Sequence, residues 1–105
     1  MVDLPDHQTL KRIEVFDKTF SKPPINRNHI RLYGHYLCPF VEITRLVLAF
    51  KQIPYQDCQV SLLSRTKWHY KLNNGFVPIL ELPSGDHIYE SDVISTYLDQ
   101  AYPTD

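Results

Sequence analysis

The chain has 105 residues, of which 43% are hydrophobic and 22% charged, a composition typical of one soluble globular domain. Its formal net charge of −1 gives no electrostatic reason to bind nucleic acid or an acidic membrane. The two cysteines lie in unlike contexts and do not indicate a disulfide framework, and the sequence contains neither a signal peptide nor a bilayer-spanning apolar run. We therefore expect a cytoplasmic protein with reduced thiols and no stable membrane association.

Residues 1–29 are polar and carry the run Lys22-Pro23-Pro24 near their end. We expect them to form an N-terminal extension, partly ordered at best, ahead of a domain at residues 30–103. Within the extension, residues 10–16 could form either a helical turn or a strand.

From residue 30 onward the hydrophobic pattern alternates between the periods of strands and helices. It predicts strands at residues 30–34, 55–62, 77–82 and 87–89, and helices at residues 39–52, 66–72 and 91–102. The first two strands are joined through a helix and should be parallel, whereas Pro83-Ser84-Gly85-Asp86 predicts a hairpin between the last two. The order β-α-β-α-β-β-α predicts an α/β thioredoxin-like fold, with a mixed four-stranded sheet and helices on both faces.

The helix expected at residues 39–52 is apolar over an unusually large part of its circumference. One stripe consists of Val41, Thr44 and Leu48, and a second consists of Ile43, Val47 and Phe50 with Leu46 between the two. The sheet can cover one of these faces. The other face therefore predicts either a further domain or a partner subunit.

Cys38 carries the strongest chemical signal, because Cys38-Pro39 falls between a strand and the start of a helix. The positive end of the helix dipole and the unpaired N–H groups there favour a thiolate, and proline suits the first helical position. Position 41 is valine, so Cys38 cannot close a local disulfide and would exchange disulfides with a small thiol or another protein. A buried, unreactive capping cysteine is the alternative.

Other residues that could bear chemistry have simpler structural interpretations. Cys58 shares the inward face of a strand with Val60 and should be buried and inert, and Trp68 should belong to the core. His35 could tune Cys38, although a surface position is the plainer expectation. The five histidines lack the spacing of metal ligands, so we expect no metal.

Residues 30–103 resemble the N-terminal, glutathione-binding domain of omega-class glutathione transferases. The segments that carry the resemblance are Ile30-Arg31-Leu32-Tyr33, Cys38-Pro39-Phe40, Thr44-Arg45-Leu46-Val47-Leu48, Val77-Pro78-Ile79-Leu80-Glu81, Ile88-Tyr89-Glu90-Ser91 and Tyr97-Leu98-Asp99-Gln100-Ala101-Tyr102-Pro103. The extension with its proline pair also resembles that class. The resemblance implies a second, all-helical domain, absent from this chain, that covers the first helix.

The resemblance also implies the activity of a thiol transferase and dehydroascorbate reductase. Glutathione would be the co-substrate, the second substrate would be a small disulfide or dehydroascorbate, and homodimer contacts of the glutathione-transferase type would be available. The chloride intracellular channel proteins also carry a Cys-Pro-Phe motif on this fold, and they suggest the alternative of a glutathione-binding or redox-sensing module without turnover. Conventional conjugation to electrophiles is a third reading, to which a cysteine is poorly suited.

Residue by residue, the resemblance makes Cys38 the nucleophile that forms a mixed disulfide with glutathione, beside a pocket shaped by Phe40. Pro78 would follow a cis peptide bond, against the alternative of an ordinary trans proline, so that Val77 pairs with the cysteinyl backbone like an added strand. Glu90 would bind the α-ammonium of the γ-glutamyl group. Ser91, at a helix N-terminus, would bind its carboxylate and could equally be a plain N-cap.

Arg65 falls where the family commonly has a lysine that pairs with the glycyl carboxylate, with Lys67 as the substitute and a solvated loop arginine as the alternative. One segment departs from the family pattern Asn-Pro-Phe-Gly-Leu-Val. Aligned without a gap, this chain reads Leu72-Asn73-Asn74-Gly75-Phe76-Val77, which keeps the glycine and loses the Asn-Pro pair. The sequence therefore does not predict the geometry of the loop that leads to Val77.

Overall fold

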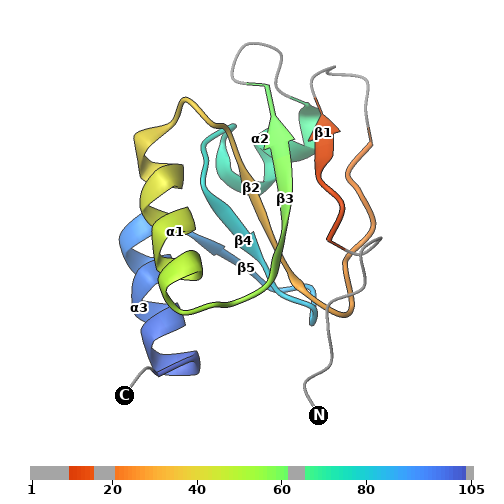
Figure 1. The fold of residues 1–105 in the computed structure, drawn as a ribbon. Helices are drawn as coiled ribbons and strands as arrows, with labels where there is room; N and C mark the ends of the chain where they lie inside the picture. The colour runs from red at the N-terminus through yellow and green to blue at the C-terminus, as the bar shows by residue number, and fades with distance from the viewer. Residues whose placement is uncertain (1–9, 16–20, 62–65, 104–105) are drawn as a thin grey trace.

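The computed structural model describes residues 10–15, 21–61 and 66–103. A mixed sheet with the strand order β1-β3-β2-β4-β5 lies at its centre (Figure 1). The strands are β1 (Ile13–Val15), β2 (Ile30–Gly34), β3 (Tyr55–Val60), β4 (Ile79–Glu81) and β5 (His87–Tyr89), and the helices are α1 (Pro39–Phe50), α2 (Lys67–Asn73) and α3 (Ser91–Ala101). Strands β1, β3 and β2 run parallel, and β4 and β5 are antiparallel to their neighbours. The α/β thioredoxin-like fold predicted from the sequence is confirmed.

The sheet has five strands, whereas the sequence predicted four. The additional strand, β1, lies within residues 10–16, for which the sequence allowed either a helical turn or a strand. Val15 lies opposite Val60 of β3, and it is buried with the core on that face of the sheet. Burial of this side chain and pairing of the β3 edge explain why the short segment is extended.

Helices cover both faces of the sheet and create two apolar clusters. Helices α1 and α3 lie side by side on one face, over a cluster that consists of Ile30, Leu32, Val41, Leu48, Ile53, Leu80, Ile94 and Leu98. On the other face, Trp68 and Leu72 of α2 pack against Val15, Tyr33, Cys58, Val60 and Ile79. The expected core roles of Trp68 and of buried Cys58 are confirmed, and burial raises the pKa of the Cys58 thiol to about 12.

Local sequence signals account for the ends of the helices. Helix α1 ends at Phe50, just before Ile53-Pro54, because the residue before a proline avoids the helical region. Helix α2 begins after Thr66, whose Oγ1 accepts a hydrogen bond from the backbone N–H of His69. It ends at Asn73, and the C-cap residue Asn74 adopts the left-handed conformation at φ 53°.

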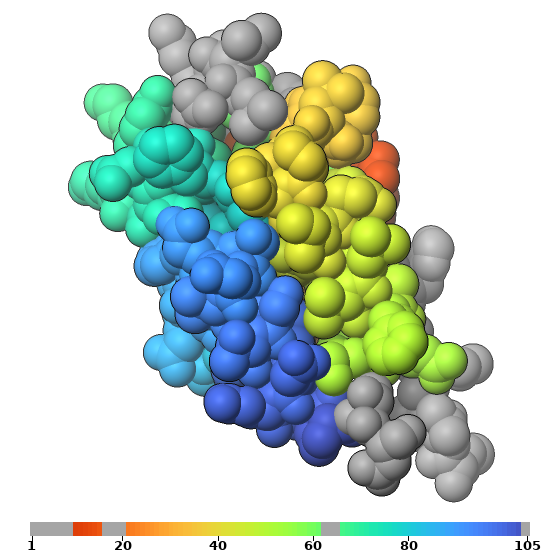
Figure 2. All heavy atoms as spheres, turned by 90° about the vertical axis from the view of Figure 1, so that its left-hand side faces the viewer, coloured from red at the N-terminus to blue at the C-terminus, as the bar shows by residue number. Residues whose placement is uncertain are grey.

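One face of the molecule exposes large apolar side chains of the two adjacent helices α1 and α3 (Figure 2). On α1, Val41, Thr44 and Leu48 are buried, as the first predicted stripe requires. Among the exposed residues are Phe40, Ile43, Leu46 and Phe50 of α1 and Val93 of α3. The second apolar face predicted for this helix is therefore present and open within the described residues.

In the described parts of the chain, no helix is long and apolar enough to cross a membrane.

Candidate functional site

Cys38 is the N-cap residue of α1, at the point where the chain leaves β2. Its backbone N–H donates to the carbonyl oxygen of His35 over 3.0 Å, and its own carbonyl accepts the backbone N–H of Glu42 over 3.2 Å. Pro39 occupies the first turn, and the Cys38 side chain makes no capping hydrogen bond. The thiol is half-buried against the core cluster under α1, at the positive end of this helix.

Gly34 allows α1 to begin close to the sheet. A Cβ built on Gly34 would lie 2.5 Å from Cγ1 of Val41, which is closer than such atoms approach in proteins. Val41 is fully buried in the first turn of α1. The last residue of β2 therefore sets how near the Cys38 end of the helix lies to the sheet.

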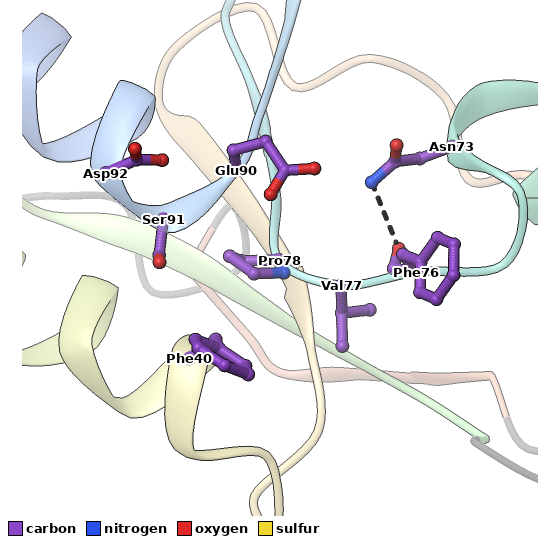
Figure 3. Close-up of a pocket in the computed structure, with 8 residues that line it drawn as sticks. All are labelled: Phe40, Asn73, Phe76, Val77, Pro78, Glu90, Ser91 and Asp92. Atoms are coloured by element: carbon purple, nitrogen blue, oxygen red, sulfur yellow. Dashed lines mark hydrogen bonds between the residues drawn. The ribbon is translucent and has the colours of Figure 1, made fainter.

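A cavity of about 520 Å³ lies between the first turn of α1, the segment that precedes β4 and the start of α3 (Figure 3). The peptide bond between Val77 and Pro78 is cis, as the sequence predicted. Phe40 projects from α1 on one side of the cavity, and Glu90 and Ser91 lie on the other. The cavity is lined by Phe40, Asn73, Phe76, Val77, Pro78, Glu90, Ser91 and Asp92.

The backbone of Val77 is available to a ligand. Within the described residues, neither its N–H nor its carbonyl forms a hydrogen bond. The loop before it is nevertheless fixed, because the backbone N–H of Phe76 donates to the carbonyl of Asn73 over 2.9 Å. In addition, Nε2 of the buried His69 ring donates to the Phe76 carbonyl over 2.8 Å. The loop that leads to the cis-proline therefore has a defined conformation, although the Asn-Pro pair is absent.

The start of α3 forms the polar end of the cavity. The alternative role that the sequence offered for Ser91, a plain N-cap, is wrong: the N-cap is Glu90, and Ser91 is the first helical residue. Glu90 has φ 71° and ψ 127°, a strained combination for a residue with a Cβ, and its carbonyl accepts the first helical bond from Ile94. This conformation turns the chain sharply, and Figure 3 shows the Glu90 carboxylate and the Ser91 hydroxyl at the cavity.

The structure brings together five of the seven residues predicted for the site, which are Phe40, Val77, Pro78, Glu90 and Ser91. Cys38 is not a lining residue, although it immediately precedes the helix whose first turn supplies Phe40. Arg65 lies outside the described residues. Lys67, its substitute, begins α2, is exposed and does not line the cavity.

Three lining residues were not predicted, namely Asn73, Phe76 and Asp92. Phe76 and Asp92 are direct neighbours of Val77 and Ser91, and adjacency was a signal that could have found them. Asn73 had no such signal. It reaches the cavity only because α2 ends there and the chain returns through Asn74 and Gly75, both at positive φ.

A cysteine at the N-cap of α1 and a cis-proline before β4, on a thioredoxin-like sheet, define a class of thiol-binding domains. Residues 32–105 match the family model of the glutathione S-transferase N-terminal domain, and the chain belongs to this family. The omega-class resemblance is confirmed by relatives, among them pig glutathione S-transferase omega-1, which is 41% identical over 81 residues. This match covers 76% of the chain and 34% of the pig protein.

Solved structures agree with this assignment. Glutathione transferase Omega 3C from Trametes versicolor is 30% identical with a TM-score of 0.65, over 72% of this chain and 34% of that one. A glutathione transferase homologue from Drosophila mojavensis, solved with bound glutathione, is 32% identical with a TM-score of 0.67, over 73% of this chain and 36% of that one. The chain spans about a third of the length of the curated relatives it matches.

Proposed function

We propose that the cavity binds glutathione and that Cys38 exchanges disulfides with it, as a thiol transferase and dehydroascorbate reductase of the omega type. The observation that carries this proposal is the cavity itself, in which the unpaired backbone of Val77 faces the same space as Glu90 and Ser91. A peptide can pair with Val77 as an added strand while its charged end meets the start of α3. The glutathione bound to the relative from Drosophila mojavensis supports the same ligand here.

In this proposal each lining group recognises one part of the tripeptide. The first-turn N–H groups of α3, with the hydroxyl of Ser91, receive the α-carboxylate of the γ-glutamyl group. The Glu90 carboxylate receives its α-ammonium. The backbone of Val77 pairs with the cysteinyl residue, which directs the thiol towards the α1 end. Phe40 and Pro78 supply apolar walls. For the glycyl carboxylate the family resemblance offers Arg65, which lies outside the described residues.

The reaction consists of two thiol–disulfide exchanges. The Cys38 thiolate attacks the glutathionyl sulfur of a mixed disulfide, the disulfide bond breaks, and the other thiol leaves and takes up a proton. A second glutathione thiolate then attacks the glutathionyl sulfur on Cys38, which releases oxidised glutathione and restores the thiolate. With dehydroascorbate, two glutathione molecules supply two electrons and two protons and leave as the disulfide.

The second candidate is a glutathione-binding or redox-sensing module without turnover. It is favoured by one observation, the open apolar face of α1 beside the cavity. The described residues leave Phe40 exposed on that side, so they do not enclose a second substrate there. Either function belongs in a reducing compartment, and we propose the cytoplasm.

Mass spectrometry after incubation with oxidised glutathione tests the proposal. We expect one glutathionyl group per chain, lost in Cys38→Ser and retained in the matched variant Cys58→Ser, because Cys58 is fully buried. Glutathione-dependent reduction of a small disulfide should then depend on Cys38. An adduct without turnover would support the binding module, and the absence of an adduct at Cys38 would overturn both functions.

A further inference from the structure

Asn73 presents an amide at the end of the cavity farthest from α3, and the sequence assigned it no role. It is the last residue of α2 and is half-buried. Its Nδ2 lies 3.5 Å from the carbonyl oxygen of Phe76, the limit of a hydrogen bond, and His69 already donates to that oxygen over 2.8 Å. Among the described residues this is the only partner of the Asn73 amide, which has two N–H groups to donate.

The lining residues lie in an order that gives the cavity two ends. Figure 3 shows Ser91 and Asp92 at one end, Asn73 and Phe76 at the other, and Val77 and Pro78 between them. A tripeptide with its γ-glutamyl group at Ser91 and its cysteinyl residue on Val77 must direct its third residue away from α3. An extended chain advances about 3.3 Å per residue, so the third residue continues beyond Val77 towards Phe76 and Asn73.

From this order we propose that Asn73 binds the C-terminal carboxylate of the tripeptide, an inference that rests on the proposed binding of glutathione. The side-chain amide donates one or both N–H groups to the carboxylate, a charge-assisted hydrogen bond. Phe76 lines the same end of the cavity. The arrangement does not require Arg65.

The acidic groups of the cavity make a hydrogen-bond donor necessary at this end. The ionisable groups among its described lining residues are Glu90 and Asp92, both acidic, and Figure 3 shows the Glu90 carboxylate extending from the start of α3 towards the Asn73 side. A ligand carboxylate placed there needs a donor to offset this negative charge, and the Asn73 amide supplies one. In the ungapped comparison with the family pattern, Asn73 stands where proline would stand, and proline has no side-chain donor. Asn73, which departs from the family pattern, thus supplies a hydrogen-bond donor.

Calorimetric titration of two ligands tests this assignment in a Cys38→Ser background, in which no mixed disulfide can form. The ligands are reduced glutathione and glutathione amide, whose glycyl carboxylate is replaced by a neutral amide. We expect the Cys38→Ser chain to bind glutathione about tenfold to a hundredfold more tightly than the amide, the size of one hydrogen bond to a charged group.

Asn73→Asp is the decisive variant, because it keeps the shape of the side chain and replaces the donor with a like charge. We expect the preference for glutathione over its amide to disappear or to reverse, and Asn73→Ala should abolish it without reversal. Asn74→Asp is the matched control, since it adds the same charge one residue away from the lining and should keep the preference. A preference unchanged in Asn73→Asp would overturn the inference alone, whereas no binding of either ligand would overturn the proposed function with it.

Discussion

Among single residues, Glu81 lies at the centre of a buried polar cluster, at the end of β4 away from the cavity. Its carboxylate is buried and accepts hydrogen bonds from Arg31 and Tyr33, each over 3.0 Å. It also accepts from His87 over 2.7 Å and from Lys22. Because Lys22 precedes β2, this cluster ties that part of the N-terminal extension to β4.

The pKa of Glu81 reflects a balance of opposing effects. Burial alone would raise it, but the hydrogen bonds from Lys22, His87 and Tyr33 outweigh burial and hold the pKa below its ordinary value of 4.5. Burial raises the pKa of Tyr33, so the phenol stays protonated and continues to donate. Glu81 is therefore ionised in the folded chain at neutral pH.

This balance predicts how stability changes with acid. Since the pKa is lower in the folded than in the unfolded chain, the contribution of Glu81 is complete above the unfolded value of about 4.5 and is lost as pH falls through the folded value. Glu81→Gln should lower the free energy of unfolding at pH 7 by about 3 kcal/mol, because it leaves buried Arg31 without its counter-charge, and should flatten the dependence below pH 5. Urea denaturation across acidic buffers measures both effects. Asp86→Asn, at an exposed carboxyl in the hairpin, is the control, and equal acid profiles for the two variants would contradict this account.

Among the elements, β2 and α1 together position the thiol, and their order was readable from the sequence. The alternation in residues 30–34, the Cys-Pro pair and the break at Ile53-Pro54 predicted a strand, a helix start and a helix end that the structure reproduces closely. These features depend on local chemistry, namely side-chain period and the backbone limits of proline. Strand β1 was harder to predict, because three residues carry too short a pattern and their conformation depends on a distant partner, β3.

The residues of the candidate site can be separated in the same way, by whether the local sequence determines their position. Val77, Pro78, Glu90 and Ser91 were predicted because short motifs carry them, and the cis bond was predicted with them. Asn73 was not predicted, because its place depends on where α2 ends and how the chain returns through two residues at positive φ. The N-cap was assigned to Ser91 because serine favours that position, whereas the turn after β5 makes Glu90 the N-cap.

Gly34 tests the contact between β2 and α1. In Gly34→Ala the new methyl group would overlap Val41, so α1 must move or the core must repack. We expect the free energy of unfolding to fall by about 1–3 kcal/mol, the usual range for overpacking. The double variant Gly34→Ala with Val41→Ala should recover part of the cost of the first change. Chemical denaturation of the three variants checks this, and an additive loss in the double variant would show that the two side chains do not meet.

For the molecule as a whole, the cavity and the open apolar face belong to one side. Helices α1 and α3 are held together at their far ends, where Lys51 pairs with Asp99 over 3.1 Å and donates to the Tyr102 carbonyl over 2.9 Å. Their near ends supply Phe40 and Ser91 to the cavity. Exposed apolar area of this kind is typical of surfaces that contact another domain or protein. In this glutathione-transferase fold the cavity and the exposed apolar face of α1 therefore lie next to each other.

The most direct test of the central claim, that Cys38 is the reactive thiol beside the cavity, is the rate at which each cysteine is alkylated at pH 7 with and without a bound ligand. Peptide mass spectrometry after brief treatment with iodoacetamide separates Cys38 from Cys58, and S-methylglutathione, which cannot exchange disulfides, serves as the ligand. We predict that Cys38 is alkylated in the folded chain, that the ligand slows this reaction, and that buried Cys58 reacts only after unfolding. A Cys38 that is not alkylated in the folded chain, or whose rate the ligand leaves unchanged, would contradict the account.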